Sequence, residues 1–175
     1  MFNSTGTLVP NLKSSMLFEE TINGYLYSTD KDKLQFDVIF NYLSKESYWA
    51  QGISREILNQ VIENSVCFGI YHGEEQVGFA RVVTDKATFG YLGDVFVLKP
   101  HRGKGLSKNL MAFILKHPEL QGFRRWLLLT KDAQSLYSQF GFIKFHAPDR
   151  CMELWYPDVY SGDPEKQKIA AKENN

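Results

Sequence analysis

The sequence has no excess of charge of either sign. Its 175 residues carry 20 Lys and Arg against 20 Asp and Glu, so the formal net charge is zero. Nucleic-acid-binding domains are usually strongly basic, and attraction to anionic lipid surfaces also needs surplus cations. The composition therefore predicts neither a nucleic-acid nor a membrane partner. With 43% hydrophobic residues, a chain of this length can bury a core as one domain without disulfide or metal support.

Cysteine is scarce as well, and long apolar runs are missing. Neither Cys67 nor Cys151 lies in a C-x-x-C pair or beside a histidine. We therefore expect no metal site and interpret both as structural, with Cys67 as a small buried hydrophobe. The longest apolar runs, such as 126–129, fall far short of the roughly 18 residues that a membrane helix needs. Because residues 1–10 also lack a signal-peptide pattern, we expect a cytoplasmic protein.

Hydrophobic periodicity predicts a single domain at 16–160, between an extension at 1–15 and a polar tail at 161–175 in which 163–165 could begin a short helix. The expected strands are 22–29, 66–71, 76–84, 88–98 and 124–130, followed by a final hairpin of 142–145 and 151–155. The expected helices are 33–45, a helix that Ser54 caps, 106–116 and 133–139.

The order of these elements predicts the fold class. Three successive strands joined by short turns indicate an antiparallel meander, whereas the strand–helix–strand unit over 91–130 indicates one parallel pair. The predicted class is therefore α+β, with a central mixed, mostly antiparallel sheet flanked by helices.

The most informative stretch is a glycine loop at 102–107, where a strand leads through R-G-K-G-L-S into an amphipathic helix. Gly103 and Gly105 let the backbone approach a ligand, and the free N–H groups of a helix start attract anions. Residues 95–118 carry five basic side chains and no acidic one. The spacing fits neither a P-loop nor a dinucleotide fingerprint, because Lys108 stands where the latter needs a third glycine. A plain tight turn is the alternative to the phosphate site that we favour.

The glycine loop Arg102-Gly103-Lys104-Gly105-Leu106-Ser107 resembles the R/Q-x-x-G-x-G/A motif of the GNAT superfamily of acetyl-CoA-dependent N-acetyltransferases, with Ser107 in place of the last Gly or Ala. A second segment, Ala133-x-x-Leu136-Tyr137-x-x-Phe140-Gly141-Phe142, is similar to that family's A-x-x-L-Y-x-x-x-G-F pattern. The two motifs occur in order with a strand between them, and the resemblance covers roughly 66–145. It implies a GNAT-like acyl-CoA N-acyltransferase fold.

The resemblance also implies roles for single residues. The amides of 102–107 would bind the coenzyme A pyrophosphate, and the main chain of 95–97 would pair with the pantetheine arm and polarise the acetyl carbonyl. Tyr137 would protonate the departing thiolate, although a packed core tyrosine is the alternative. Thr130 stands where many relatives carry an asparagine near the acetyl group. The expected coenzyme-binding residues are Val95, Phe96, Val97, Arg102, Gly103, Lys104, Gly105, Leu106, Ser107 and Thr130.

The general base and the acceptor pocket carry the weakest sequence signals. Asp94 is the acid nearest the reacting end of the 88–98 strand and is the candidate base, with a structural aspartate or a water chain as alternatives. Tyr48 and Trp49, between the first two helices, and Arg81 are candidates to bind the acceptor, although ordinary packing explains them equally well.

These residues together lead to one functional hypothesis and one alternative. The protein would move an acetyl group from acetyl-CoA directly to a primary amine of a small molecule or peptide, without a metal. Many relatives dimerise, so a homodimer remains open. The alternative is a non-catalytic acyl-CoA-binding sensor on the same fold, and a weaker one is a nucleotide-binding protein of another class.

Overall fold

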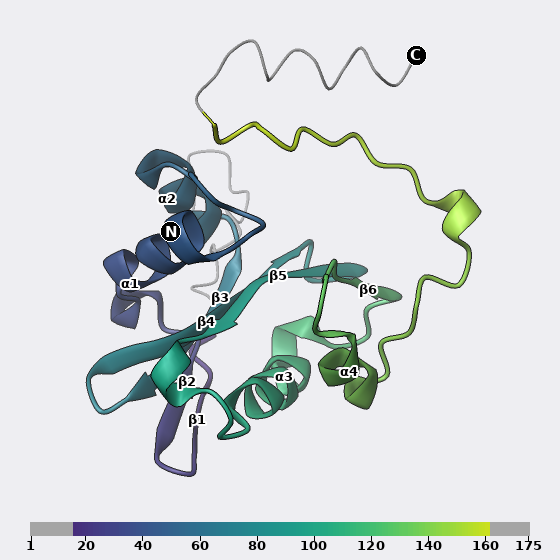
Figure 1. Cartoon of the computed structure of the whole chain (residues 1–175). Helices are drawn as coiled ribbons and strands as arrows, with labels where there is room; N and C mark the ends of the chain where they lie inside the picture. Colours follow the sequence, from purple (N-terminus) through teal and green to yellow (C-terminus); the bar gives the residue numbers. More distant parts are fainter. Residues whose placement is uncertain (1–15, 162–175) are drawn as a thin grey trace, which may run out of the picture.

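A computed structural model describes residues 16–161, and its core is one six-stranded sheet in the order β1-β2-β3-β4-β5-β6 (Figure 1). The strands are β1 (Glu19–Ile22), β2 (Tyr25–Ser28), β3 (Val66–His72), β4 (Glu75–Thr84), β5 (Phe89–Val97) and β6 (Arg125–Leu127). The first five pair antiparallel, and β6 pairs parallel to β5. This confirms the mixed, mostly antiparallel sheet. The expected extension at 1–15 and the helix start at 163–165 lie outside the described residues.

Helices flank both faces of this sheet. The α-helices are α1 (Phe36–Asn41), α2 (Arg55–Glu63), α3 (Leu106–Lys116) and α4 (Gln134–Tyr137). A π-helical turn (Tyr42–Glu46) follows α1, and short 3-10 turns lie at Lys31–Lys33, Lys99–His101, Pro118–Leu120, Ser138–Phe140 and Pro148–Arg150. Ser54 caps α2 as predicted, because its Oγ accepts a hydrogen bond from the N–H of Ile57 at 3.3 Å. Within 16–161, no helix has the length and apolar character to cross a bilayer.

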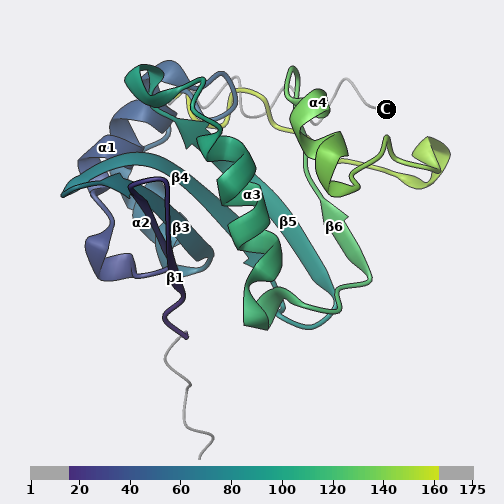
Figure 2. The same ribbon diagram turned by 90° about the horizontal axis from the view of Figure 1, so that it is seen from below.

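Two hydrophobic clusters hold these layers together. On one face α1, the π-helical turn and α2 pack around Leu43, Leu58 and Phe79. On the other face α3 and α4 pack around Phe68 and Phe113. Figure 2 shows α3 lying along the sheet with α4 beside it. Because α3 starts where β5 ends, the glycine loop lies at the same end of the molecule as the end of β5.

The structure corrects the predicted first strand. Residues 22–29 are not one strand but the end of a hairpin, since β1 and β2 pair through a two-residue turn at Asn23 and Gly24. Both turn residues have positive φ, at 51° and 80°. Asn-Gly is the preferred sequence of such a turn, and it marks a hairpin that strand periodicity alone did not reveal.

The predicted final hairpin is wrong. Neither 142–145 nor 151–155 forms a strand, and within 16–161 no strand pairs with the outer edge of β6. A 3-10 turn at Pro148–Arg150 separates the two segments, and their apolar side chains face solvent: Ile143 is 80% and Met152 is 96% exposed. Alternation predicts a strand only where a neighbouring strand edge supplies hydrogen bonds, and none pairs with these segments here.

Candidate functional site

The site begins where β5 separates from β6. The two strands pair only at Phe89, Gly90 and Tyr91, after which β5 continues to Val97 with no described strand on that side. On its other side, β5 contains a bulge, with a register shift against β4 and a φ of 53° at Asp94. A bulge bends a strand and re-aims side chains. Since the side chains of Phe96 and Val97 are buried in the two clusters, the main chain is what this stretch can offer a ligand.

The bulge directs Asp94 into a polar cluster. Arg81 Nε donates a hydrogen bond to Asp94 Oδ2, and Trp49 Nε1 donates to Asp94 Oδ1 at 2.8 Å. Arg81 also donates to Ser65 Oγ at 3.3 Å. The side chains of Asp94 and Arg81 are only 9% and 17% exposed. The structure thus brings the candidate base Asp94 together with two candidate acceptor-binding residues, Trp49 and Arg81. The base role of Asp94 stays a prediction, and both its oxygens already accept hydrogen bonds.

Residues 48–52, which follow the π-helical turn and which we call the aromatic loop, connect β5 to the segment after β6. Trp49 connects it to β5, and the Tyr48 hydroxyl accepts a hydrogen bond from the N–H of Lys131 at 3.0 Å. The Lys131 ammonium lies 5.8 Å from the centre of the Tyr48 ring. Tyr48 and Trp49 remain 55% and 40% exposed, and their rings meet edge to face at 4.9 Å. They therefore lie partly exposed beside Asp94 and Lys131, and their contact with a substrate stays a prediction.

Tyr137 lies on α4, whose start is held by Thr130. The Thr130 hydroxyl accepts a hydrogen bond from the N–H of Ala133 at 3.1 Å, and the Ala133 carbonyl accepts one from the N–H of Tyr137 at 3.3 Å. Burial, reinforced by the Tyr48 phenol and the Asp132 carboxylate, raises the pKa of Tyr137 to about 12. The phenol therefore keeps its proton at neutral pH. Among residues 16–161, its hydroxyl has no hydrogen-bond partner and is available to a ligand.

The glycine loop has the geometry of an anion site. Gly103 and Gly105 have φ values of 78° and 77°, in the left-handed region, and a Cβ on either would meet no atom of residues 16–161 within 4 Å. Gly105 is the N-cap of α3 and makes no side-chain cap, so the first-turn amides of Leu106 and Ser107 lack helical carbonyl partners. Lys104 and Lys108 are exposed beside them. Free amides, open space and cations at one helix start suit a phosphate group.

The Arg102 side chain holds this loop rather than extending from it. Its Nε donates to the Val97 carbonyl at 2.8 Å, and its Nη2 donates to the Tyr42 hydroxyl at 3.0 Å. The Tyr42 ring stacks on Phe96 at 3.9 Å. Neither sequence motif includes Tyr42, so its contact with Arg102 was not predicted. A third loop contact joins Lys104 Nζ to the Tyr25 hydroxyl at 3.2 Å.

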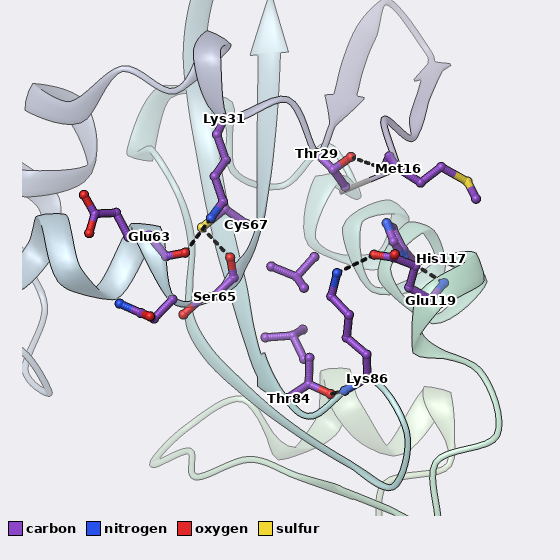
Figure 3. Close-up of a pocket in the computed structure, with 13 residues that line it drawn as sticks. Met16, Thr29, Lys31, Glu63, Ser65, Cys67, Thr84, Lys86, His117 and Glu119 are labelled. Atoms are coloured by element: carbon purple, nitrogen blue, oxygen red, sulfur yellow. Dashed lines mark hydrogen bonds and ion pairs between the residues drawn. The ribbon is translucent and has the colours of Figure 1, made fainter. Parts of the chain in front are cut away.

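A hollow lies at the C-terminal end of α3, opposite the glycine loop, and none of the predicted site residues lines it. It has a volume of about 290 Å³ and lies where β3 begins and β4 ends (Figure 3). Its cations are already engaged, because Lys31 donates to the Ile62 carbonyl at 2.6 Å and Lys86 pairs with Glu119 at 2.7 Å. Burial raises the pKa of Cys67 to about 11, so its thiol is not a nucleophile at neutral pH. We therefore take the glycine loop, rather than this hollow, as the candidate functional site.

Known proteins resemble this chain in both sequence and fold. The pattern of the Acetyltransferase (GNAT) family matches residues 36–142. A candidate acetyltransferase of Gibberella zeae is 34% identical over an alignment of 141 residues, and the match covers 68% of this chain and 78% of that protein. The crystal structure of a candidate GNAT-family acetyltransferase from Xanthomonas campestris pv. campestris is 44% identical, with a TM-score of 0.78 over 81% of this chain and 99% of that one.

A more distant structure, of a candidate acetyltransferase from Clostridium acetobutylicum with acetyl-CoA, shares 14% identity. Its TM-score is 0.53 over 75% of this chain and 94% of that one, and at this identity it shows the fold alone. Together these matches confirm the fold class and the family resemblance that the two motifs predict.

Proposed function

Because the chain belongs to the acetyltransferase (GNAT) family, we propose that it transfers an acetyl group from acetyl-CoA directly to a primary amine of a small molecule or peptide. The observation that carries the proposal is the glycine loop: two left-handed glycines and an uncapped helix start, with no atom in the space where a Cβ would stand. The Clostridium structure, which shares the fold, is of a protein with acetyl-CoA.

The residues of the loop fit coenzyme A. Its pyrophosphate is a compact dianion, and the amides of 103–107 with Lys104 and Lys108 would hold it. The main chain of β5 beyond Tyr91, which has no described strand on the side of β6, would hydrogen-bond the amides of the pantetheine arm. When bound, acetyl-CoA supplies an acyl group that its thioester has already activated.

Groups of this chain would then act on two atoms of acetyl-CoA, the acyl oxygen and the departing sulfur. A main-chain N–H of 95–97 donates to the acyl oxygen as negative charge grows there, while the amine nitrogen forms the C–N bond and the C–S bond breaks. The Tyr137 phenol donates to the departing sulfur. Since the pKa of Tyr137 is about 12 and that of an ordinary thiol about 8.5, complete proton transfer is uphill by about 5 kcal/mol. Tyr137 thus stabilises the thiolate mainly by a hydrogen bond. Water accepts the proton that the amine loses and delivers a proton to the thiolate, so that the products are the amide and the free thiol.

The acceptor side is built from the Asp94 cluster. With Arg81 and Trp49 bound to it, Asp94 holds the aromatic loop in position rather than accepting a proton. The exposed faces of Tyr48 and Trp49 would contact the apolar part of the amine substrate. A substrate carboxylate would have to compete with Asp94 for Arg81, which favours acceptors without one.

The direct test measures thiol release from acetyl-CoA in the presence of a panel of amines that includes polyamines, amino esters and peptides. Release that depends on an amine, with the acetylated amine identified by mass spectrometry, supports the proposal. Tight coenzyme A binding with no turnover on any amine would instead indicate the acyl-CoA sensor. Failure to bind coenzyme A would overturn both functions.

A further inference from the structure

Tyr42 lies where the helices on one face of the sheet meet the end of β5, and it has no part in the proposed chemistry. It begins the π-helical turn Tyr42–Glu46, after which the N–H of Ser47 donates to the Tyr42 carbonyl at 2.9 Å, five residues back. Such a turn is rare, because it departs from the more favourable α-helical hydrogen bonding, and it occurs frequently at functional sites. The fold thus maintains Tyr42 in this position at a cost.

Aromatic neighbours fix the Tyr42 ring. It stacks on Phe96 of β5, with ring centres 3.9 Å apart and ring planes 11° apart, and its centre lies 6.4 Å from that of the Trp49 ring. Tyr42 and Phe96 both belong to the buried cluster of α1 and α2. Because the stack needs only the ring, phenylalanine at this position would keep it. The hydroxyl can therefore be removed without loss of the packing.

The Tyr42 hydroxyl is the second anchor of the Arg102 side chain. Arg102 Nη2 donates to this hydroxyl at 3.0 Å, while Arg102 Nε donates at 2.8 Å to the carbonyl of Val97, the last residue of β5. Burial raises the pKa of Tyr42 although the Arg102 charge opposes the shift, so the phenol is protonated at neutral pH. A free arginine side chain has many rotamers, and two hydrogen bonds to separate partners restrict them. Arg102 thereby ties the first residue of the glycine loop to the end of β5.

We propose that Tyr42 is a positioning residue for coenzyme A, because through Arg102 it sets the distance between the glycine loop and the end of β5. The inference rests on the proposed use of acetyl-CoA. The loop would hold the pyrophosphate and β5 the pantetheine arm of the same ligand, so the two parts must match its length. A site that already has this form binds without the cost of ordering the loop. Without the Tyr42 hydroxyl, Arg102 would keep only the Val97 carbonyl, and the loop would sample other positions.

Tyr42→Phe tests the hydroxyl alone. Calorimetric titration with coenzyme A should give a Kd about tenfold higher than that of wild type, since a hydrogen bond to a charged group is lost. In steady-state assays KM for acetyl-CoA should rise by a similar factor, whereas kcat and KM for the amine should stay within about twofold of wild type, because the ring still contacts Trp49. Tyr71→Phe is the matched control. Tyr71 is also buried, but its hydroxyl has no hydrogen-bond partner within 16–161, so the Kd for coenzyme A should not change.

A double-mutant cycle then distinguishes positioning from direct contact with the coenzyme. Arg102→Lys keeps the charge but loses the planar fork that reaches two partners, so it should raise the Kd for coenzyme A by itself. Tyr42→Phe added to Arg102→Lys should then raise the Kd by less than about twofold more, because both changes break the same contact.

The other outcomes of the cycle contradict the proposal. A full tenfold effect of Tyr42→Phe in the Arg102→Lys background would mean that the phenol contacts coenzyme A itself. An unchanged or lower Kd for the single Tyr42→Phe variant would mean that Arg102 does not need this hydroxyl when coenzyme A binds. Either result overturns positioning by Tyr42 while leaving the proposed function intact. Failure of the wild type to bind coenzyme A would overturn both.

Discussion

The two sides of the site are built differently. The proposed coenzyme side, residues 102–107, relies on main-chain groups: two left-handed glycines and the amides of one helix start. The proposed acceptor side, formed by Trp49, Arg81 and Asp94, relies on side chains from three separate elements. A main-chain site depends on local conformation, whereas a side-chain site depends on contacts between distant parts of the chain.

This difference predicts opposite sensitivities to mutation. On the proposed coenzyme side, a substitution should matter most when it adds a Cβ at a glycine and less when it removes the charge of Lys104 or Lys108. On the proposed acceptor side, replacement of one carboxylate oxygen of Asp94 should already lower activity, because each of its two oxygens accepts a hydrogen bond from a specific partner. The following variants test that contrast, together with the phenol between the two sides.

Tyr137→Phe should give the largest effect. It removes the one hydroxyl assigned to the departing sulfur, so kcat should fall by about 100-fold while coenzyme A affinity changes little. Steady-state kinetics and calorimetric titration with coenzyme A measure the two quantities. Tyr48→Phe is the matched control, because it removes a neighbouring phenol whose one hydrogen-bond partner within 16–161 is the N–H of Lys131, and it should lower kcat by no more than about threefold. A Tyr137→Phe enzyme as fast as wild type would refute the assignment.

Gly105→Val should mainly weaken coenzyme binding. A branched residue is strained at a φ of 77°, and the loop would relax away from its phosphate-binding form, raising the Kd for coenzyme A by roughly 10- to 100-fold. Gly122→Val is the control, since Gly122 has a φ of 76° with equally open space but lies outside the loop. Its stability should fall by a similar amount with no change in Kd. Equal Kd values for the two variants would show that the loop does not bind coenzyme A.

Asp94→Asn tests whether this residue positions the acceptor side or accepts a proton. Loss of the charge weakens the contact with Arg81, and kcat/KM for the amine should fall by about ten- to thirtyfold, mostly through KM. The acidic limb of the pH–rate profile should keep its shape, because water takes the proton. A flattened acidic limb with an unchanged KM would instead identify Asp94 as the base. Asp37→Asn breaks an exposed ion pair with Arg55 and should change neither parameter.

The same contrast explains what could be predicted from the sequence. Helix α3 begins and ends where the hydrophobic periodicity predicts, at residues 106 and 116. The start of α2 follows from another local signal, the capping residue Ser54. The family followed from two local motifs. The contact of Trp49 with Asp94 joins residues 45 positions apart, and no local pattern encodes it. The final hairpin failed for a related reason, since alternation at 151–155 describes a strand without specifying the edge that it pairs with.

The smallest effect concerns stability in alkali, and it separates burial of the Tyr137 phenol from its chemistry. Burial raises the pKa of Tyr137 from 10.0 to about 12, so the folded state holds the phenolic proton more tightly than the unfolded state. The resulting stabilisation is complete below pH 10 and is lost as the pH rises through 12. At pH 11 the loss amounts to about 1.4 kcal/mol. Urea unfolding at pH 8 and pH 11 should therefore show wild type losing about 1.4 kcal/mol more than Tyr137→Phe, which has no proton to lose. If wild type and Tyr137→Phe lose equal unfolding free energy, water reaches the phenol freely in the folded state. A phenol so hydrated would stabilise the departing thiolate little better than bulk water does.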